Sequence, residues 1–154
     1  MLAVLLYGSE TWTLTQPDWK RLDSFHTRCQ RRNGRILHIR WYDHITNDEV
    51  LRLTSNRSPR GPAASSIVRK RRLGLFGHVA RLADDVPANQ ILQICCKAQD
   101  GVRPSPDWRR ARGRPLTTWI HQIRRDTGIS VTDALELAGD RSFWRQIATA
   151  GCYG

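Results

Sequence analysis

The chain has 154 residues, a length that fits one domain, and 40% of them are hydrophobic, an ordinary share for a soluble protein. Its 25 Lys and Arg residues outnumber its 14 Asp and Glu residues and give a net charge of +11. This composition argues against a membrane span or a fibre. Almost all the cations are arginines, since lysine occurs only at positions 20, 70 and 97, and guanidinium groups bind phosphate in a bidentate manner. Nucleic acid is therefore the favoured partner, ahead of an anionic membrane surface or a basic domain that offsets acidic neighbours.

The four cysteines, at positions 29, 95, 96 and 152, predict free thiols. The opening Met1–Tyr7 segment has no basic residues before its apolar run and is too short for a signal core or a membrane span. We therefore expect a reducing compartment, nuclear or cytoplasmic, and neither secretion nor membrane insertion.

The first half of the chain predicts helices. Residues 1–8 are typical of a buried helix end. Thr15 is placed to cap a second helix, in which Trp19, Leu22, Phe25 and Cys29 recur at helical spacing until Asn33-Gly34 interrupts the pattern as a kink or a short inserted loop. The segment Thr46-Asn47-Asp48-Glu49 is a capping box that predicts a short helix over 47–54.

The second half continues in the same way. A helix over about 66–83, starting at Ser65 or Ser66, has an apolar stripe of Val68, Leu75, Val79 and Leu82, with Phe76 beside it. Further helices are predicted over 87–98, with Ile91, Leu92, Ile94 and Cys95 as its apolar residues, and over 116–127, ending at Gly128. One more is expected after a Thr132 cap, and a last one from Asp140 or Ser142.

The predicted fold class is all-α. Its expected parts are a thumb-like helical segment at 1–54, a linker at 55–66, a basic helical segment at 67–99, a basic Pro/Arg-rich linker at 100–115, and a C-terminal helical segment at 116–154.

Five segments are familiar when taken together and in order. They are Leu5–Leu14, Arg35–Asp43 leading to Thr46–Leu51, Arg71–Arg81, Arg112–Pro115 with Trp119-Ile120, and Asp140-Arg141 with Trp144-Arg145. In this order they resemble the carboxyl-terminal part of LINE-type endonuclease–reverse transcriptases, the non-long-terminal-repeat retrotransposon polyproteins. The resemblance extends from about residue 3 to about residue 147.

The resemblance implies that this chain corresponds to the helical thumb of such an enzyme, which grips the template–primer duplex, and to the segment that follows the thumb. The family's polymerase palm carries an aromatic-x-Asp-Asp box for catalytic metals. The adjacent acids here, Asp48-Glu49 and Asp84-Asp85, are explained by the helix cap and by a solvated loop. We therefore expect a detached piece of an RNA-directed DNA polymerase and endonuclease, without catalysis or a cofactor of its own.

Two basic patches are the predicted nucleic-acid-binding sites. Residues 52–81 contain no acid, and their candidate contacts are Arg57, Arg60, Arg69, Lys70, Arg71, Arg72 and Arg81. The alternative is a solvated helix face whose side-chain stems cover apolar surface.

The second patch combines a candidate stacking residue with several arginines: Trp108, Arg109, Arg110, Arg112 and Arg114. Its Arg112-Gly113-Arg114-Pro115 segment matches the core of an AT-hook, whose arginines enter a narrow minor groove. The basic residues usual after that proline are missing, so a loop with Pro115 opening the next helix is the alternative.

No metal site is predicted. His26-x-x-Cys29 has the spacing of half a zinc site, but Cys95-Cys96 and His121 supply no second half, and a core face explains the spacing equally well. His78 is expected to be partly buried. Three functional hypotheses remain: a fragment that binds RNA–DNA hybrid or target DNA through its basic faces, an interaction-only fragment that self-associates through its apolar N-terminus, and a DNA-binding module that uses the AT-hook-like loop.

Overall fold

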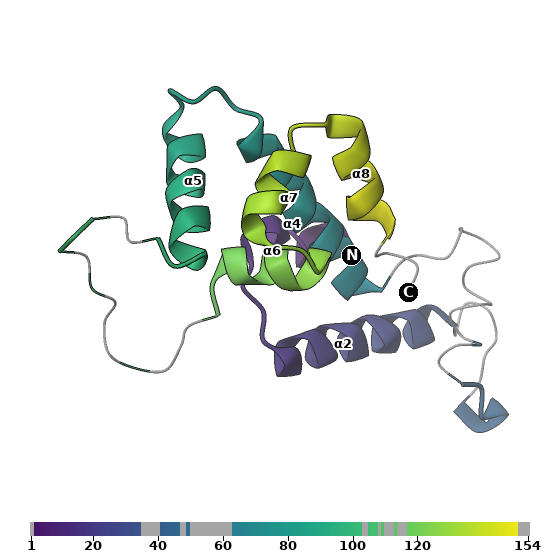
Figure 1. Ribbon diagram of the computed structural model, residues 1–154. Coiled ribbons are helices and arrows are strands. Elements are labelled where there is room, and N and C mark those ends of the chain that lie inside the picture. Colours follow the sequence, from purple (N-terminus) through teal and green to yellow (C-terminus); the bar gives the residue numbers. More distant parts are fainter. Residues whose placement is uncertain are drawn as a thin grey trace. The chain divides into compact units, whose positions relative to one another are not determined.

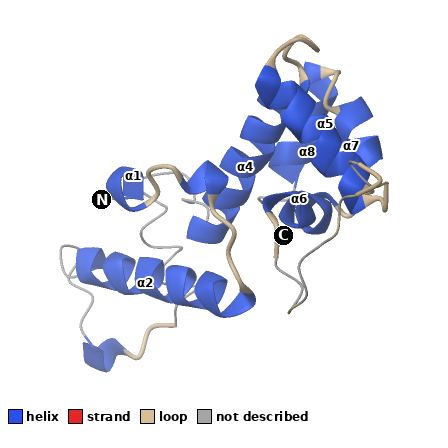
Figure 2. Ribbon diagram, turned by 90° about the vertical axis from the view of Figure 1, so that its left-hand side faces the viewer, coloured by secondary structure: helices blue, strands red, loops and turns tan. Residues whose placement is uncertain are grey.

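The computed structural model describes residues 2–34, 41–46, 49, 63–102, 105–107, 109, 113 and 117–150. Every regular element in these ranges is a helix, which confirms the all-α prediction (Figure 1 and Figure 2). No helix among them is long and apolar enough to cross a bilayer. The elements are α1 Leu2–Leu5, η1 Ser9–Thr11, α2 Gln16–Gly34, η3 Trp41–Asp43, α4 Ala64–Ala80, α5 Pro87–Gln99, α6 Trp119–Thr127, α7 Val131–Leu137 and α8 Arg141–Ala150.

The chain divides into two units. Unit 1 comprises Met1–Thr13 and Val68–Gly154, and unit 2 comprises Leu14–Ile67. Helix α4 contributes its first turn to unit 2 and the remainder to unit 1. The predicted linker at 55–66 therefore overlaps the start of a helix, since α4 begins at Ala64.

Unit 2 is built on α2, whose first turn is closed by a side chain. The Asp18 carboxylate accepts a hydrogen bond from the Thr15 amide at 3.1 Å, and it also accepts one from the Thr15 hydroxyl. Thr15 therefore stands at the predicted cap position, but its hydroxyl donates to Asp18. The helix runs to Gly34, so the predicted interruption at Asn33-Gly34 coincides with the helix end.

Unit 2 also contains the first bond of the predicted capping box. The Glu49 amide donates to the Thr46 hydroxyl oxygen at 3.3 Å. Almost all of the helix predicted over 47–54 lies outside the described residues.

Unit 1 packs α4 to α8 around one hydrophobic core. The buried residues of that core are Leu73, Phe76, Leu92, Cys96, Ile120, Ile123, Val131, Ala134, Ala138, Trp144 and Ala148. The Trp144 indole nitrogen donates to the Leu73 carbonyl oxygen at 2.7 Å, and the Trp144 and Phe76 ring centroids are 5.3 Å apart. These contacts hold α8 close against α4.

The buried side of α4 differs from the predicted stripe. Val68 and Phe76 are fully buried, and so is Leu73. Leu75, Val79 and Leu82 of the predicted stripe are only half-buried. The buried side of α4 is hard to recognise in the sequence because the cationic run at 69–72 belongs partly to it, and one of these arginines is buried beside Leu73.

Helix α5 has the predicted bounds within one residue, but its apolar side chains do not all point inward. Leu92 and Cys96 are buried, whereas Ile91 is 61% exposed and Ile94 is 49% exposed. His78 on α4 is likewise exposed, against the prediction of a partly buried histidine.

The helix ends of unit 1 follow local rules. Gly128 ends α6 with a positive φ of 75°, as predicted, and the Asp140 carboxylate accepts from the Ser142 and Phe143 amides at 2.8 and 3.2 Å. The starts of two helices differ from the prediction. Thr118 caps α6, so the helix begins at 119 and not at 116, and Ser130 caps α7 in place of Thr132.

Two glycines of α4 provide a matched test of the contact with α8. A Cβ at Gly77 would overlap Cδ1 and Nε1 of Trp144, whereas a Cβ at Gly74 would meet nothing within 4 Å. We expect Gly77→Ala to lower the free energy of unfolding by about 1–3 kcal/mol, because the indole must move. Gly74→Ala should raise it by about 0.4–1 kcal/mol through the lower entropy of the unfolded chain. Urea denaturation of both variants measures these changes, and a gain in stability for both would show that α8 is not seated on Gly77.

Candidate nucleic-acid interface

The exposed side of α2 concentrates positive charge. Helical geometry places its five exposed cations on one arc of about 120° that extends for about 18 Å along the axis. We call this surface the α2 basic face, and it consists of Lys20, Arg21, Arg28, Arg31 and Arg32.

Neither acid of α2 lies among these exposed residues. Asp18 and Asp23 are both half-buried. Asp18 accepts the bonds from Thr15, and Asp23 accepts a hydrogen bond from the Ser65 amide at 3.0 Å. Their carboxylates close the helix start and bind the first turn of α4. The hydrogen bonds from Thr15 lower the pKa of Asp18, and the nearby Arg21 guanidinium adds to that shift. With five exposed cations against these two acids, the α2 basic face keeps a net positive charge.

The opposite side of α2 is its packing side. His26 is 6% exposed, and Trp19, Leu22 and Cys29 are half-buried. Burial lowers the pKa of His26, and nearby Asp23 opposes that shift. Phe25 is 45% exposed, so its predicted place in the apolar stripe is wrong. This division between the two sides of the helix sets the direction in which the α2 basic face points.

The predicted contacts at residues 69–81 are used largely within unit 1. Arg72 has no exposed side-chain surface, and its Nη1 donates to Oδ2 of Asp126 at 2.6 Å. The prediction that Arg72 contacts nucleic acid is therefore wrong. Burial lowers the pKa of Arg72, and it raises the pKa of Asp126 although Arg72 opposes that shift.

Three other arginines of this patch donate to backbone carbonyl oxygens. Arg69 binds the carbonyl of Asp126, Arg71 binds that of Leu6, and Arg81 binds that of Ala138 at 2.7 Å. Each bond joins residues far apart in the sequence, so these arginines stabilise the fold of unit 1. Lys70, Arg71 and Arg81 are nevertheless exposed, and their role in binding stays a prediction.

The second predicted patch is described only in part. Arg109 is exposed, but Trp108, Arg110, Arg112 and Arg114 lie outside the described residues, as do Arg57 and Arg60 of the first patch. The α2 basic face was not among the predicted sites, although its signal is present in the sequence. Cations at 20, 21, 28, 31 and 32 recur with the 3.6-residue period of a helix.

Comparison with known proteins gives one relative. The chain is 29% identical over 151 residues to an uncharacterized transposon-derived protein of Caenorhabditis elegans, and the match covers 94% of this chain. It covers 49% of the relative, so the chain spans about half of that protein's length. No protein-family profile and no solved structure matches. The similarity supports a transposon origin for the sequence.

The buried ion pair makes a double-mutant test possible. Removing one partner leaves an uncompensated buried charge, so we expect Arg72→Met or Asp126→Leu alone to destabilise unit 1 by about 3–5 kcal/mol. The double variant should be within about 1 kcal/mol of the wild type or more stable, because both charges then lose their desolvation cost together. Chemical denaturation of the four proteins measures the coupling, and simple additivity of the two losses would contradict it.

His26 gives α2 a pH dependence. Its folded pKa lies below the value of about 6.5 that it has when unfolded, so the stabilisation is present above that value and is lost as the pH falls through the folded pKa. We expect amide hydrogens of α2 to exchange faster, after correction for intrinsic rates, at about pH 5.5 than at about pH 7.5. His26→Gln should reduce this difference, and an unchanged difference would exclude His26 as its source.

Proposed function

We propose that this chain is a non-catalytic, nucleic-acid-binding part of a retrotransposon reverse transcriptase, equivalent to its thumb and the segment that follows. In this proposal, unit 2 grips the RNA–DNA hybrid or target DNA through the α2 basic face. The observation that carries it is the gathering of five exposed cations on one side of α2, against two half-buried acids in the same helix. The resemblance of the sequence to LINE-type enzymes and the transposon-derived relative support it.

The dimensions of α2 suit a phosphate backbone. Duplex DNA carries one negative charge per about 1.7 Å of its axis, so a face about 18 Å long lies beside roughly ten phosphates. Guanidinium groups can each contact one of them in a bidentate manner. Contacts of this kind fix position and not sequence, and we therefore expect similar affinity for duplexes of different sequence.

The test compares two variants of equal charge. One changes Lys20, Arg21, Arg28 and Arg32 to Ala, and the control changes exposed Lys97, Arg124, Arg141 and Arg145 to Ala. Fluorescence anisotropy of a labelled RNA–DNA hybrid is recorded over a salt series, with circular dichroism as a check on folding. Because each lost phosphate contact reduces the slope of log K against log salt by about 0.9, the α2 variant should lose about three to four units of slope. The control should keep most of the wild-type slope.

The other outcomes separate the alternatives. Equal losses in the two variants would mean that net charge acts and the α2 basic face does not. A folded wild type that fails to bind at low salt would favour an interaction-only fragment. A clear preference for A·T-rich duplex that disappears in Arg112→Ala would transfer the function to the AT-hook-like loop.

A further inference from the structure

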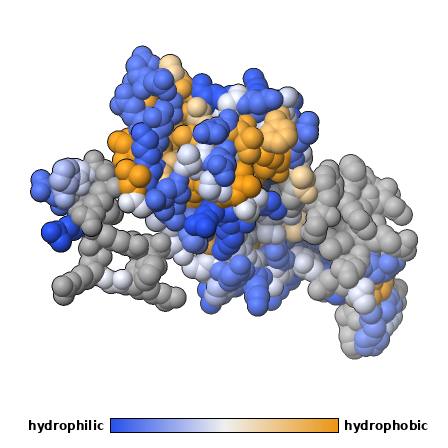
Figure 3. Space-filling model, viewed as in Figure 1, coloured by the Kyte–Doolittle hydropathy of each residue, from blue (hydrophilic) through white to orange (hydrophobic). Residues whose placement is uncertain are grey.

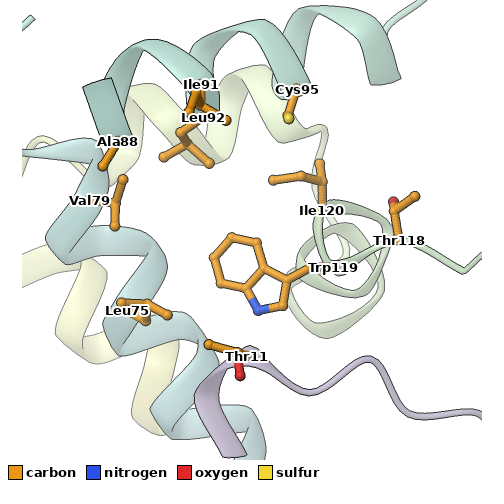
Figure 4. Close-up of a pocket in the computed structure, with 10 residues that line it drawn as sticks. All are labelled: Thr11, Leu75, Val79, Ala88, Ile91, Leu92, Cys95, Thr118, Trp119 and Ile120. Carbon is orange, nitrogen blue, oxygen red and sulfur yellow. The ribbon is translucent and has the colours of Figure 1, made fainter. Parts of the chain in front are cut away.

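Unit 1 contains an open apolar groove of about 480 Å³. Figure 4 shows the Trp119 ring pointing into the space between α4 and α5. Its apolar walls come from three helices that are distant in the sequence, and their main side chains are Leu75, Val79, Ile91, Leu92, Trp119 and Ile120. None of these residues belongs to the α2 basic face.

The walls of the groove are fixed by contacts behind them. The Trp119 indole nitrogen donates to the Glu10 carbonyl oxygen at 2.8 Å, and the Trp119 ring centroid is 6.2 Å from that of buried Phe76. Leu92 is only 5% exposed. An occupant therefore meets a preformed surface and does not have to order it, which reduces the entropic cost of binding.

The spacing of side chains along α5 suits a helix as the occupant. Ala88, Ile91 and Cys95 line the groove at positions i, i+3 and i+7, the spacing with which two helices pack. Ile91 is 61% exposed, and Figure 3 shows apolar surface next to hydrophilic surface over α5. Sites for small molecules add convergent polar groups that fix orientation, whereas the polar groups of this lining are the Thr11 and Thr118 hydroxyls and the Cys95 thiol.

The charged residues around the groove indicate which side chains should flank the apolar side of the bound helix. Neither α4 nor α5 contains an acidic residue. Exposed Arg71 lies one turn before Leu75, and exposed Arg124 lies one turn after Ile120. Among the acids near the lining in sequence, exposed Asp85 precedes Ala88 by three residues. The Asp84 carboxylate accepts from the Asn89 and Gln93 side chains, Glu10 is half-buried, and the Asp100 carboxylate accepts from the Thr132 hydroxyl. The exposed arginines thus flank the groove on its α4 and α6 sides, and cations at these places are complementary to a helix with one apolar side and acidic flanks.

We propose that this groove is a docking site for an acidic amphipathic helix of a partner protein, which inserts a leucine-type side chain between Ile91 and Trp119. The site lies within unit 1 and uses no residue of the α2 basic face. It therefore adds a protein partner to the proposed nucleic-acid partner, and each proposal can fail without the other.

The experiment uses a designed probe with a matched control peptide. The probe is a fluorescein-labelled peptide of about 18 residues, long enough to form a helix when bound, with leucine at every third or fourth position and glutamate and alanine elsewhere. The control peptide has lysine in place of each glutamate. Binding to the full chain is measured by anisotropy at moderate salt.

Two variants of α5 locate the binding surface. Ile91→Glu places a charge in the groove, while Ile94→Glu changes an exposed isoleucine of the same helix that does not line it. Since both side chains are largely exposed, both variants should fold. We expect Ile91→Glu to weaken binding of the glutamate peptide at least about tenfold, which corresponds to the loss of one well-buried apolar contact. The affinity of Ile94→Glu for the same peptide should stay within about twofold of the wild-type value.

Several results would overturn the proposal. They are a failure of the glutamate peptide to bind, equal binding of the lysine peptide, and equal weakening by the two variants. Sedimentation equilibrium provides a further result that would overturn it. If the wild type is dimeric and Ile91→Glu makes it monomeric, the groove is occupied by a second copy of this chain and not by an acidic helix. Loss of hybrid binding in Ile91→Glu but not in Ile94→Glu would instead assign the groove to nucleic acid.

Discussion

Four consecutive cations in one helix impose the constraint on which unit 1 depends. Successive residues of an α-helix are about 100° apart, so residues 69–72 of α4 together cover most of its circumference. A helix that must bury one side cannot expose all four. Arg72 is the residue that is buried, and its charge requires an acid in the core, which α6 supplies as Asp126.

Three further arginines extend this arrangement: Arg69 and Arg71 in α4, and Arg81 just after its end. Arg69 and Arg71 donate to the carbonyl oxygens of Asp126 and Leu6, and Arg81 donates to that of Ala138. Through these bonds α4 is joined to α6, to the turn after α1 and to the end of α7. The arginine-rich composition of the chain is therefore partly a property of its core.

Local rules predicted the helices well and the buried sides poorly. Gly128 and Asp140 fix helix ends through backbone geometry and a single carboxylate, so the sequence around them is sufficient. Burial depends on which helix lies opposite. Ile91 and Leu92 have similar hydrophobicity and stand side by side, yet one is exposed and the other buried, because α6 and α7 pack on only one side of α5. The α2 basic face follows from the period of five cations, but recognising it requires knowledge of which side of α2 packs.

The contrast between α2 and α4 limits what net charge can say about binding. Both helices are arginine-rich, and a sum over the sequence weights them equally. In α4 much of the charge is neutralised by Asp126 or directed at carbonyl groups that already carry partial negative charge. The α2 basic face exposes five cations against two half-buried acids, and one of the five, Arg31, also donates to the Ile45 carbonyl oxygen at 3.1 Å. Counterion release depends on the cations that can reach phosphate. The net charge of +11 therefore does not give the number of phosphate contacts, and the arrangement of each helix decides how many of its cations contribute.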